Sequence, residues 1–170
     1  VLVLYGRLPD ILYPPGNTQP DGSLAELFIE SDDGDVIINH GDWMFYKSST
    51  DMTDNTGAGL ENMMDIPGIG MSADDTPMIV TDLGREIAPS LVDFLSDRPM
   101  FLDQLEGNWL VEVSLAQNAD GTRADPVIVR DGDLGRLIPV YQTNNQADPK
   151  GAVAAEIISW LLGTQLVPSQ

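Results

Sequence analysis

The chain has 170 residues, a length that suits one packed core and is short for two. It carries 27 acidic and 8 basic residues, which gives a formal net charge of −19. This charge disfavours nucleic acid and anionic membranes as partners, because both recruit clustered Lys and Arg. The lack of cysteine in the sequence excludes disulfides, Cys-ligated zinc and a cysteine nucleophile.

No apolar stretch of the sequence approaches the roughly 20 residues that a membrane-spanning helix needs. The acidic residues are mostly aspartate, 20 against 7 glutamates, and such surfaces suit high ionic strength because salt screens their repulsion. We therefore expect a marine or halophilic bacterial source and an extracellular or periplasmic location. Val1 lies within an apolar run without an initiator Met, so we also expect residues 1–170 to be one domain of a longer chain.

The first third of the chain predicts a strand, a helix and a second strand. Residues 1–5 form an apolar run typical of a buried strand. After a loop rich in Pro and Gly, Ser23 and Glu26 have the spacing of a capping box, which predicts a helix start. We expect three residues on the buried face of this helix: Leu24, Leu27 and Phe28. Residues 35–39 predict the second strand, and this order of elements favours a parallel crossover.

The last third of the chain predicts more strands and a final helix. Residues 109–116 alternate between apolar and polar side chains, which indicates a strand. The runs 126–130 and 134–141 flank an Asp-Gly-Asp turn and predict an antiparallel hairpin. Asp148 and Gly163 have the residue types expected at the two ends of a helix. These elements favour a mixed sheet with helices on its faces.

The turn after the second strand is the candidate ligand site. Ligands of open α/β sheets bind beyond the carboxyl ends of the parallel strands. We expect five residues of this turn to bind the ligand: His40, Gly41, Asp42, Trp43 and Tyr46. The imidazole of His40 titrates near neutrality, and the rings of Trp43 and Tyr46 offer stacking faces. The structural alternative is that the aromatic side chains are core and that Asp42 closes a turn.

A second polar segment, residues 118–125, alternates oxygen-bearing side chains as calcium loops do. Its glycine is displaced and the closing glutamate is missing, so an ordinary polar turn is the competing interpretation and we expect no metal. Arg123 is a scarce basic residue in this acidic segment. We expect it to bind a carboxylate or a ligand anion, the alternative being a surface ion pair of little energetic weight. The many neighbouring carboxylates of the chain are assigned no catalytic role.

Two segments of the chain carry a family resemblance. Residues 24–41, from Leu24-Ala25-Glu26-Leu27-Phe28-Ile29-Glu30 to Asn39-His40-Gly41, resemble the corresponding region of ThuA-like (trehalose-utilisation) proteins, which belong to the class I glutamine amidotransferase-like superfamily. Residues 135–141 resemble the Gly-Arg-containing strand of that family. The resemblance spans residues 1–46 and 126–163. It implies a flavodoxin-like three-layer α/β/α sandwich, with a mostly parallel sheet, one antiparallel hairpin and a missing N-terminal unit.

The resemblance also bears on activity. It places His40 where amidotransferases carry their nucleophilic cysteine, so the lack of cysteine excludes amidotransfer. The Gly-His pair that the family has after its Gly-Arg strand reads Gln142-Thr143 here. We expect a ThuA-like domain without a cofactor that binds a small polar ligand, above all a carbohydrate, at the His40 turn. One alternative is a hydrolase on a sugar-related substrate, with His40 as general base oriented by Asp42. Another is a non-catalytic interaction module of a larger extracellular protein.

Overall fold

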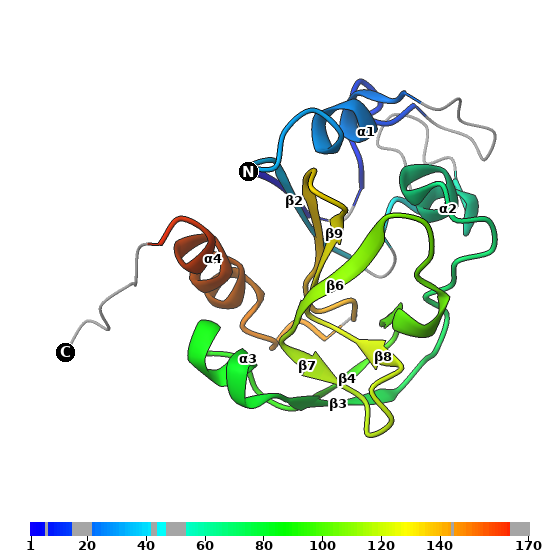
Figure 1. The fold of residues 1–170 in the computed structure, drawn as a ribbon. Helices are drawn as coiled ribbons and strands as arrows, with labels where there is room; N and C mark the ends of the chain where they lie inside the picture. Colours follow the sequence, from blue (N-terminus) through cyan, green and yellow to red (C-terminus); the bar gives the residue numbers. More distant parts are fainter. Residues whose placement is uncertain (6, 15–21, 42–43, 47–53, 144, 164–170) are drawn as a thin grey trace.

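The computed structural model describes residues 1–5, 7–14, 22–41, 44–46, 54–143 and 145–163. Two five-stranded sheets curve together into a half-barrel (Figure 1). The first sheet contains, in spatial order, β1 (Leu2–Tyr5), β2 (Val36–His40), β10 (Arg136–Pro139), β9 (Val127–Asp131) and β6 (Trp109–Ser114). The second sheet contains β4 (Phe94–Ser96), β3 (Thr76–Val80), β7 (Ala116–Gln117), β8 (Arg123–Ala124) and β5 (Met100–Phe101).

The first sheet combines parallel and antiparallel pairing. β1 and β10 both pair in parallel with β2, which confirms the crossover predicted for the start of the chain. β9 and β10 form the predicted antiparallel hairpin, whose turn contains Gly132 with φ of 51°. β6 extends the sheet beyond β9, also in antiparallel orientation. In the second sheet every pair is antiparallel.

The helices cover the two faces of the first sheet. They are α1 (Leu24–Ile29), α2 (Ala58–Met64), α3 (Asp82–Ile87) and α4 (Lys150–Leu161), with a short 3-10 helix η1 (Leu102–Gln104). Ile37 of β2 belongs to a core cluster with residues of α1 and α2, whereas Val36 and Ile38 belong to a second cluster with residues of α3 and α4. Because successive strand residues point to opposite faces, β2 is buried on both sides. Within the described residues, no helix has the length and apolar character needed to cross a membrane.

The expected flavodoxin-like sandwich with a mostly parallel sheet is wrong. Among the described strands, parallel pairing is confined to β1, β2 and β10. Residues 76–124 supply a separate antiparallel sheet instead of further strand–helix–strand units. The strands of this second sheet are two to five residues long. Parallel pairing needs a crossover of about a dozen residues or more, whereas antiparallel pairing tolerates tight turns. The fold that the resemblance implied is therefore wrong, and we assign no residue role from the resemblance.

The buried face expected for α1 is confirmed only for Phe28, which is half-buried and packs against the core. Leu24 and Leu27 are about half exposed, at 53% and 50%, and the buried residues are Ala25, Glu26 and Ile29. The predicted capping box explains the difference. The Glu26 carboxylate accepts the backbone N–H of Ser23 at 3.1 Å, which holds this side chain inward. Ile29 lies three residues further along the same face of the helix.

Candidate functional site

His40 ends β2, at the carboxyl edge of the three parallel strands. Its Nδ1 lies 2.9 Å from the carbonyl oxygen of Val140. A carbonyl only accepts, so Nδ1 carries the proton and Nε2 is left as an acceptor. Partial burial lowers the pKa of His40, an effect that the Val140 carbonyl opposes and Lys150 reinforces. The ring is therefore neutral at neutral pH, and it lies beside the Tyr5 ring with centroids 5.6 Å apart.

The structure describes only some of the other residues predicted for this turn. Asp42 and Trp43 lie outside the described residues, so their predicted roles stay predictions. Gly41 is buried and Tyr46 is half-buried. Phe45 belongs to the core, as the structural alternative held, and packs on Tyr13 with ring centroids 5.4 Å apart.

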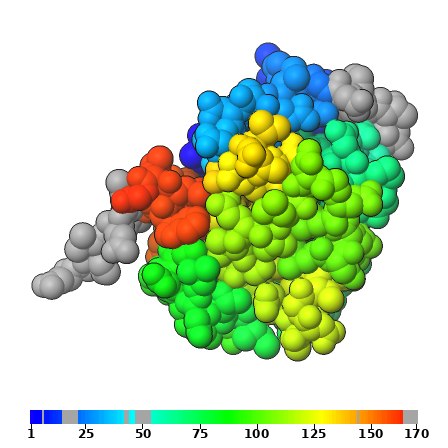
Figure 2. All heavy atoms as spheres, viewed as in Figure 1, coloured from blue at the N-terminus to red at the C-terminus, as the bar shows by residue number. Residues whose placement is uncertain are grey.

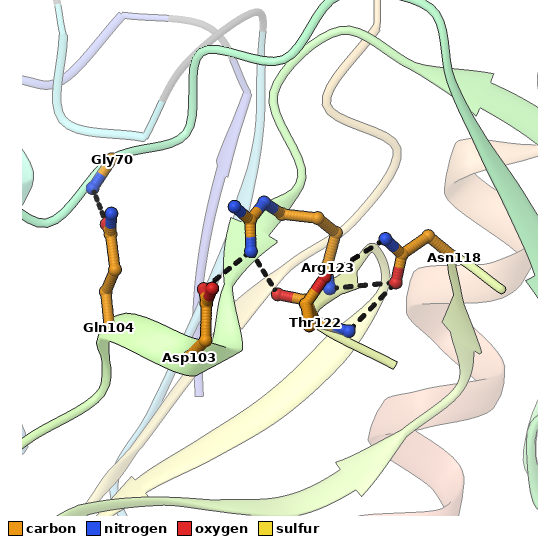
Figure 3. A network of polar contacts seen from close by, with 6 residues as sticks. All are labelled: Gly70, Asp103, Gln104, Asn118, Thr122 and Arg123. Carbon is orange, nitrogen blue, oxygen red and sulfur yellow. Dashed lines mark hydrogen bonds and ion pairs between the residues drawn. The ribbon is translucent and has the colours of Figure 1, made fainter. Parts of the chain in front are cut away.

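Arg123 lies in β8 of the second sheet, whereas His40 lies in β2 of the first. Its guanidinium donates to Asp103 at 2.5 Å and to the carbonyl of Thr122 at 2.7 Å, as Figure 3 shows. The guanidinium carbon is also 3.6 Å from the centroid of the Phe101 ring. The carboxylate held by Arg123 is thus one from the chain itself, and a ligand role for Arg123 stays a prediction.

The segment predicted as either a calcium loop or a polar turn is a turn between β7 and β8. The side-chain oxygen of Asn118 accepts the backbone N–H groups of Thr122 at 2.9 Å and Arg123 at 3.0 Å (Figure 3). This oxygen closes the turn from within, as Asx turns do. Gly121 supplies the positive φ of 68° that the turn requires.

A buried polar cluster joins the two sheets, and the sequence did not predict it. We call it the inter-sheet cluster and define it by four fully buried residues: Asn39, Ser96, Asp125 and Gln142. Asp125 Oδ2 accepts the Ser96 hydroxyl at 2.6 Å and the Gln142 backbone N–H at 2.7 Å. Burial raises the pKa of Asp125 to about 7, although hydrogen bonding by the Ser96 side chain and by the Gln142 and Tyr141 backbones acts to lower it. Asp followed by Pro in a polar segment is typical of an exposed turn, so the sequence held no signal of this burial.

A cavity of about 620 Å³ lies between α1, α2, the chain before β6 and the β9–β10 turn. We call it the acidic cavity, because its lining includes five carboxylates: Glu26, Glu30, Asp65, Glu106 and Asp131. Asn108 and Trp109 add an amide and an indole, and Ile29, Met63, Met64 and Leu134 add apolar surface. Figure 2 shows the segments that line the cavity on one face of the molecule: α1 in blue, the β9–β10 turn in gold, the chain before β6 in green and α2 in teal.

Three of these carboxylates are close together. Glu26, Glu30 and Asp65 each offer an oxygen, and these atoms lie within 4.8 Å of one another. Glu26 is held by the start of α1, where it accepts N–H groups of Gly22 and Ser23. Asp65 is held by the end of α2, where it is the C-cap residue with φ of 53°. Burial first and Asp65 second raise the pKa of Asp131. Two helix ends thus concentrate negative charge on one wall of the cavity.

Comparisons with known proteins identify no family for this chain. No family model matches the chain, and neither a curated protein nor a solved structure does. The chemistry open to the chain is therefore inferred from geometry alone. The acidic cavity offers acceptors, an amide and an aromatic ring around a space of ligand size. Among the described residues, the His40 edge offers a neutral imidazole with the Tyr5 ring beside it.

Proposed function

We propose that the protein binds a small carbohydrate in the acidic cavity. The supporting observation is the lining itself, in which carboxylates and the Asn108 amide stand with the Trp109 indole around about 620 Å³. Ligand sites occupy roughly 300–1,000 Å³ and combine apolar or aromatic surface with a few placed polar groups. Carboxylates accept hydrogen bonds from sugar hydroxyls, and an indole face covers the C–H side of a sugar ring.

The ligand class is the one predicted from the sequence, a carbohydrate. The proposed binding site is the acidic cavity instead of the His40 turn. The sequence predicts the His40 turn because it follows a parallel strand, and the roles of its residues stay predictions. The acidic cavity is bounded by described residues of four separate segments. It therefore offers groups that converge from separate parts of the chain.

Glycan-array screening followed by calorimetry tests the proposal. We expect Trp109→Ala to reduce affinity for the best glycan at least about tenfold, because stacking aromatics dominate such contacts. Trp160→Ala is the matched control, since Trp160 lies in α4, is 38% exposed and does not line the acidic cavity. Asn108→Ala gives a second cavity variant should Trp109→Ala fold poorly. Failure to bind any glycan, or equal losses in the two Trp variants, would overturn the proposal.

The same samples separate the competing interpretations. Hydrolysis products in the incubated mixture would favour the hydrolase. A rise in Tm with CaCl₂ that needs no glycan and disappears in Asp65→Asn would place a cation in the cavity instead of a sugar. Asp120→Asn is the control for that measurement, because Asp120 is an exposed residue of the β7–β8 turn. Binding of neither glycan nor cation would favour the interaction module.

A further inference from the structure

The inter-sheet cluster connects the end of β4 with the chain that follows β10. Ser96 is the last residue of β4, in the second sheet, and Gln142 lies three residues beyond Pro139, the last residue of β10 in the first sheet. A single oxygen, Asp125 Oδ2, accepts a hydrogen bond from each of them. This carboxyl therefore links one sheet to the other.

Gln142 extends the connection in both directions. Its carbonyl accepts the backbone N–H groups of Asp97 at 2.9 Å and Arg98 at 3.1 Å, directly after β4. Its side-chain amide donates to the carbonyl of Asn39 at 2.8 Å, at the end of β2. Hydrogen bonds therefore connect Asp125, directly or through Gln142, to the ends of β2, β4 and β10.

The cluster does not satisfy an ionised carboxylate. Asp125 Oδ1, Gln142 Oε1 and both polar side-chain atoms of Asn39 have no hydrogen-bond partner within the described part of the chain. A fully buried charge with half of its acceptors unused is costly, whereas the neutral acid is far less so. The raised pKa of Asp125, about 7, agrees with this geometry.

The neighbouring charged groups do not favour ionisation either. Asp148, which precedes α4, faces Asp125 with a like charge and raises its pKa. Tyr141 is the other titratable neighbour, and its own pKa is raised chiefly by burial. Arg98 is close in sequence to Ser96, but its guanidinium donates to Asp74 and to the carbonyl of Asp97. Among the described residues no cation forms an ion pair with Asp125.

We propose that Asp125 is a proton-controlled contact between the two sheets. The protonated acid keeps the end of β4 against the chain that follows β10. Loss of the proton leaves a buried charge that the hydrogen bonds to Oδ2 stabilise only in part, because Oδ1 has no partner among the described residues. Solvent must then reach the carboxylate, so the contact opens as the pH rises through neutrality. Asp125 does not line the acidic cavity, so this inference is independent of the proposed function.

Hydrogen–deuterium exchange between pH 5 and pH 9, corrected for intrinsic exchange rates, tests the proposal. We expect the amides of Asp97, Arg98 and Gln142 to lose protection as the pH rises, with a midpoint near pH 7. Asp125→Asn cannot ionise, so its protection should not change with pH, while Asp120→Asn should follow the wild-type profile. Protection in the wild type that is independent of pH, or that Asp125→Asn leaves equally pH-dependent, would overturn the proposal.

Two further variants test the proposal should Asp125→Asn fail to fold. The Ser96 hydroxyl stabilises the ionised form of Asp125, so Ser96→Ala should raise the midpoint. Asp148→Asn removes a like charge and should lower it. Opposite displacements by these two variants support the proposal. Displacements in the same direction, or none, contradict it.

Discussion

The acidic cavity and the inter-sheet cluster accommodate carboxylates in opposite ways. In the cavity, three carboxylates lie within 4.8 Å of one another, and backbone N–H groups and an open space offset their repulsion. In the cluster, one carboxyl is sealed between two sheets with an unpartnered oxygen among the described residues. Local access to solvent or ligand thus decides how strongly burial favours the neutral form of an acid.

The largest expected effect concerns the pH dependence of stability. Asp125 has a pKa near 7 in the folded state and about 3.8 as its ordinary value. Between these values the folded state holds a proton that the unfolded state has released, so stability falls as the pH rises from about 4 to 7 and is then constant. The loss is on the order of 4 kcal/mol as an upper bound. Urea unfolding at several pH values measures it, and Asp125→Asn should remove most of the slope; an unchanged slope would refute the assignment.

A second prediction concerns the position of α2, which supplies Asp65 to the cavity. A Cβ on Gly59 would lie 2.1 Å from the carbonyl oxygen of Phe45, a contact with backbone that cannot move aside. Gly59→Ala should therefore cost about 2–3 kcal/mol and weaken ligand binding. Gly151→Ala is the matched control, because nothing lies within 4 Å of its Cβ and alanine favours the helix by about 0.5–1 kcal/mol. Thermal unfolding of both variants measures the difference, and an unchanged Tm in Gly59→Ala would contradict this explanation.

A third prediction separates helix capping from cavity shape. Ser23→Ala removes the acceptor for the Glu26 backbone N–H and should cost about 1 kcal/mol. Thr81→Ala removes the equivalent acceptor for Gly84 at the start of α3. It should cost at least as much, because the Thr81 hydroxyl also donates to the carbonyl of Ser114. Only Ser23→Ala should also weaken glycan binding, because α3 does not line the acidic cavity. Equal affinities in calorimetry would mean that Glu26 does not contribute to the site.

The smallest expected effect concerns His40. The imidazole donates to Val140 and does not line the acidic cavity, so His40→Ala should change glycan affinity by less than about twofold, as for distant independent sites. His40→Gln, which keeps a donor, is the control for loss of stability. A loss of affinity in His40→Ala that stability does not explain would return the ligand to the turn predicted from the sequence.

Sequence patterns predicted the parts of the fold that local chemistry determines. The capping box at Ser23 and the Asp-Gly turn of the β9–β10 hairpin have short-range causes, and both were confirmed. The second sheet was not predictable, because strands such as β5 and β8, two residues each, are too short to display a period. Their pairing is set by tertiary contacts that no single segment encodes.

The candidate site shows the same limit. Glu26 was identified as a capping residue, but its place in the wall of a cavity depends on α2 and on the β9–β10 turn, far away in sequence. The sequence places Asp125 at the end of a polar loop, and its burial depends on Ser96 and Gln142. Single-sequence patterns report the neighbours along the chain, whereas both of these roles come from neighbours in space.

The position of the ligand is the central claim, and the indole signals of the three tryptophans report it most directly. A two-dimensional proton–nitrogen NMR titration with the best glycan, assigned by Trp→Phe variants, distinguishes Trp43, Trp109 and Trp160. We expect the Trp109 signal to move with ligand concentration while the other two stay in place. Movement of the Trp43 signal without that of Trp109 would contradict the cavity and restore the turn after β2 as the binding site.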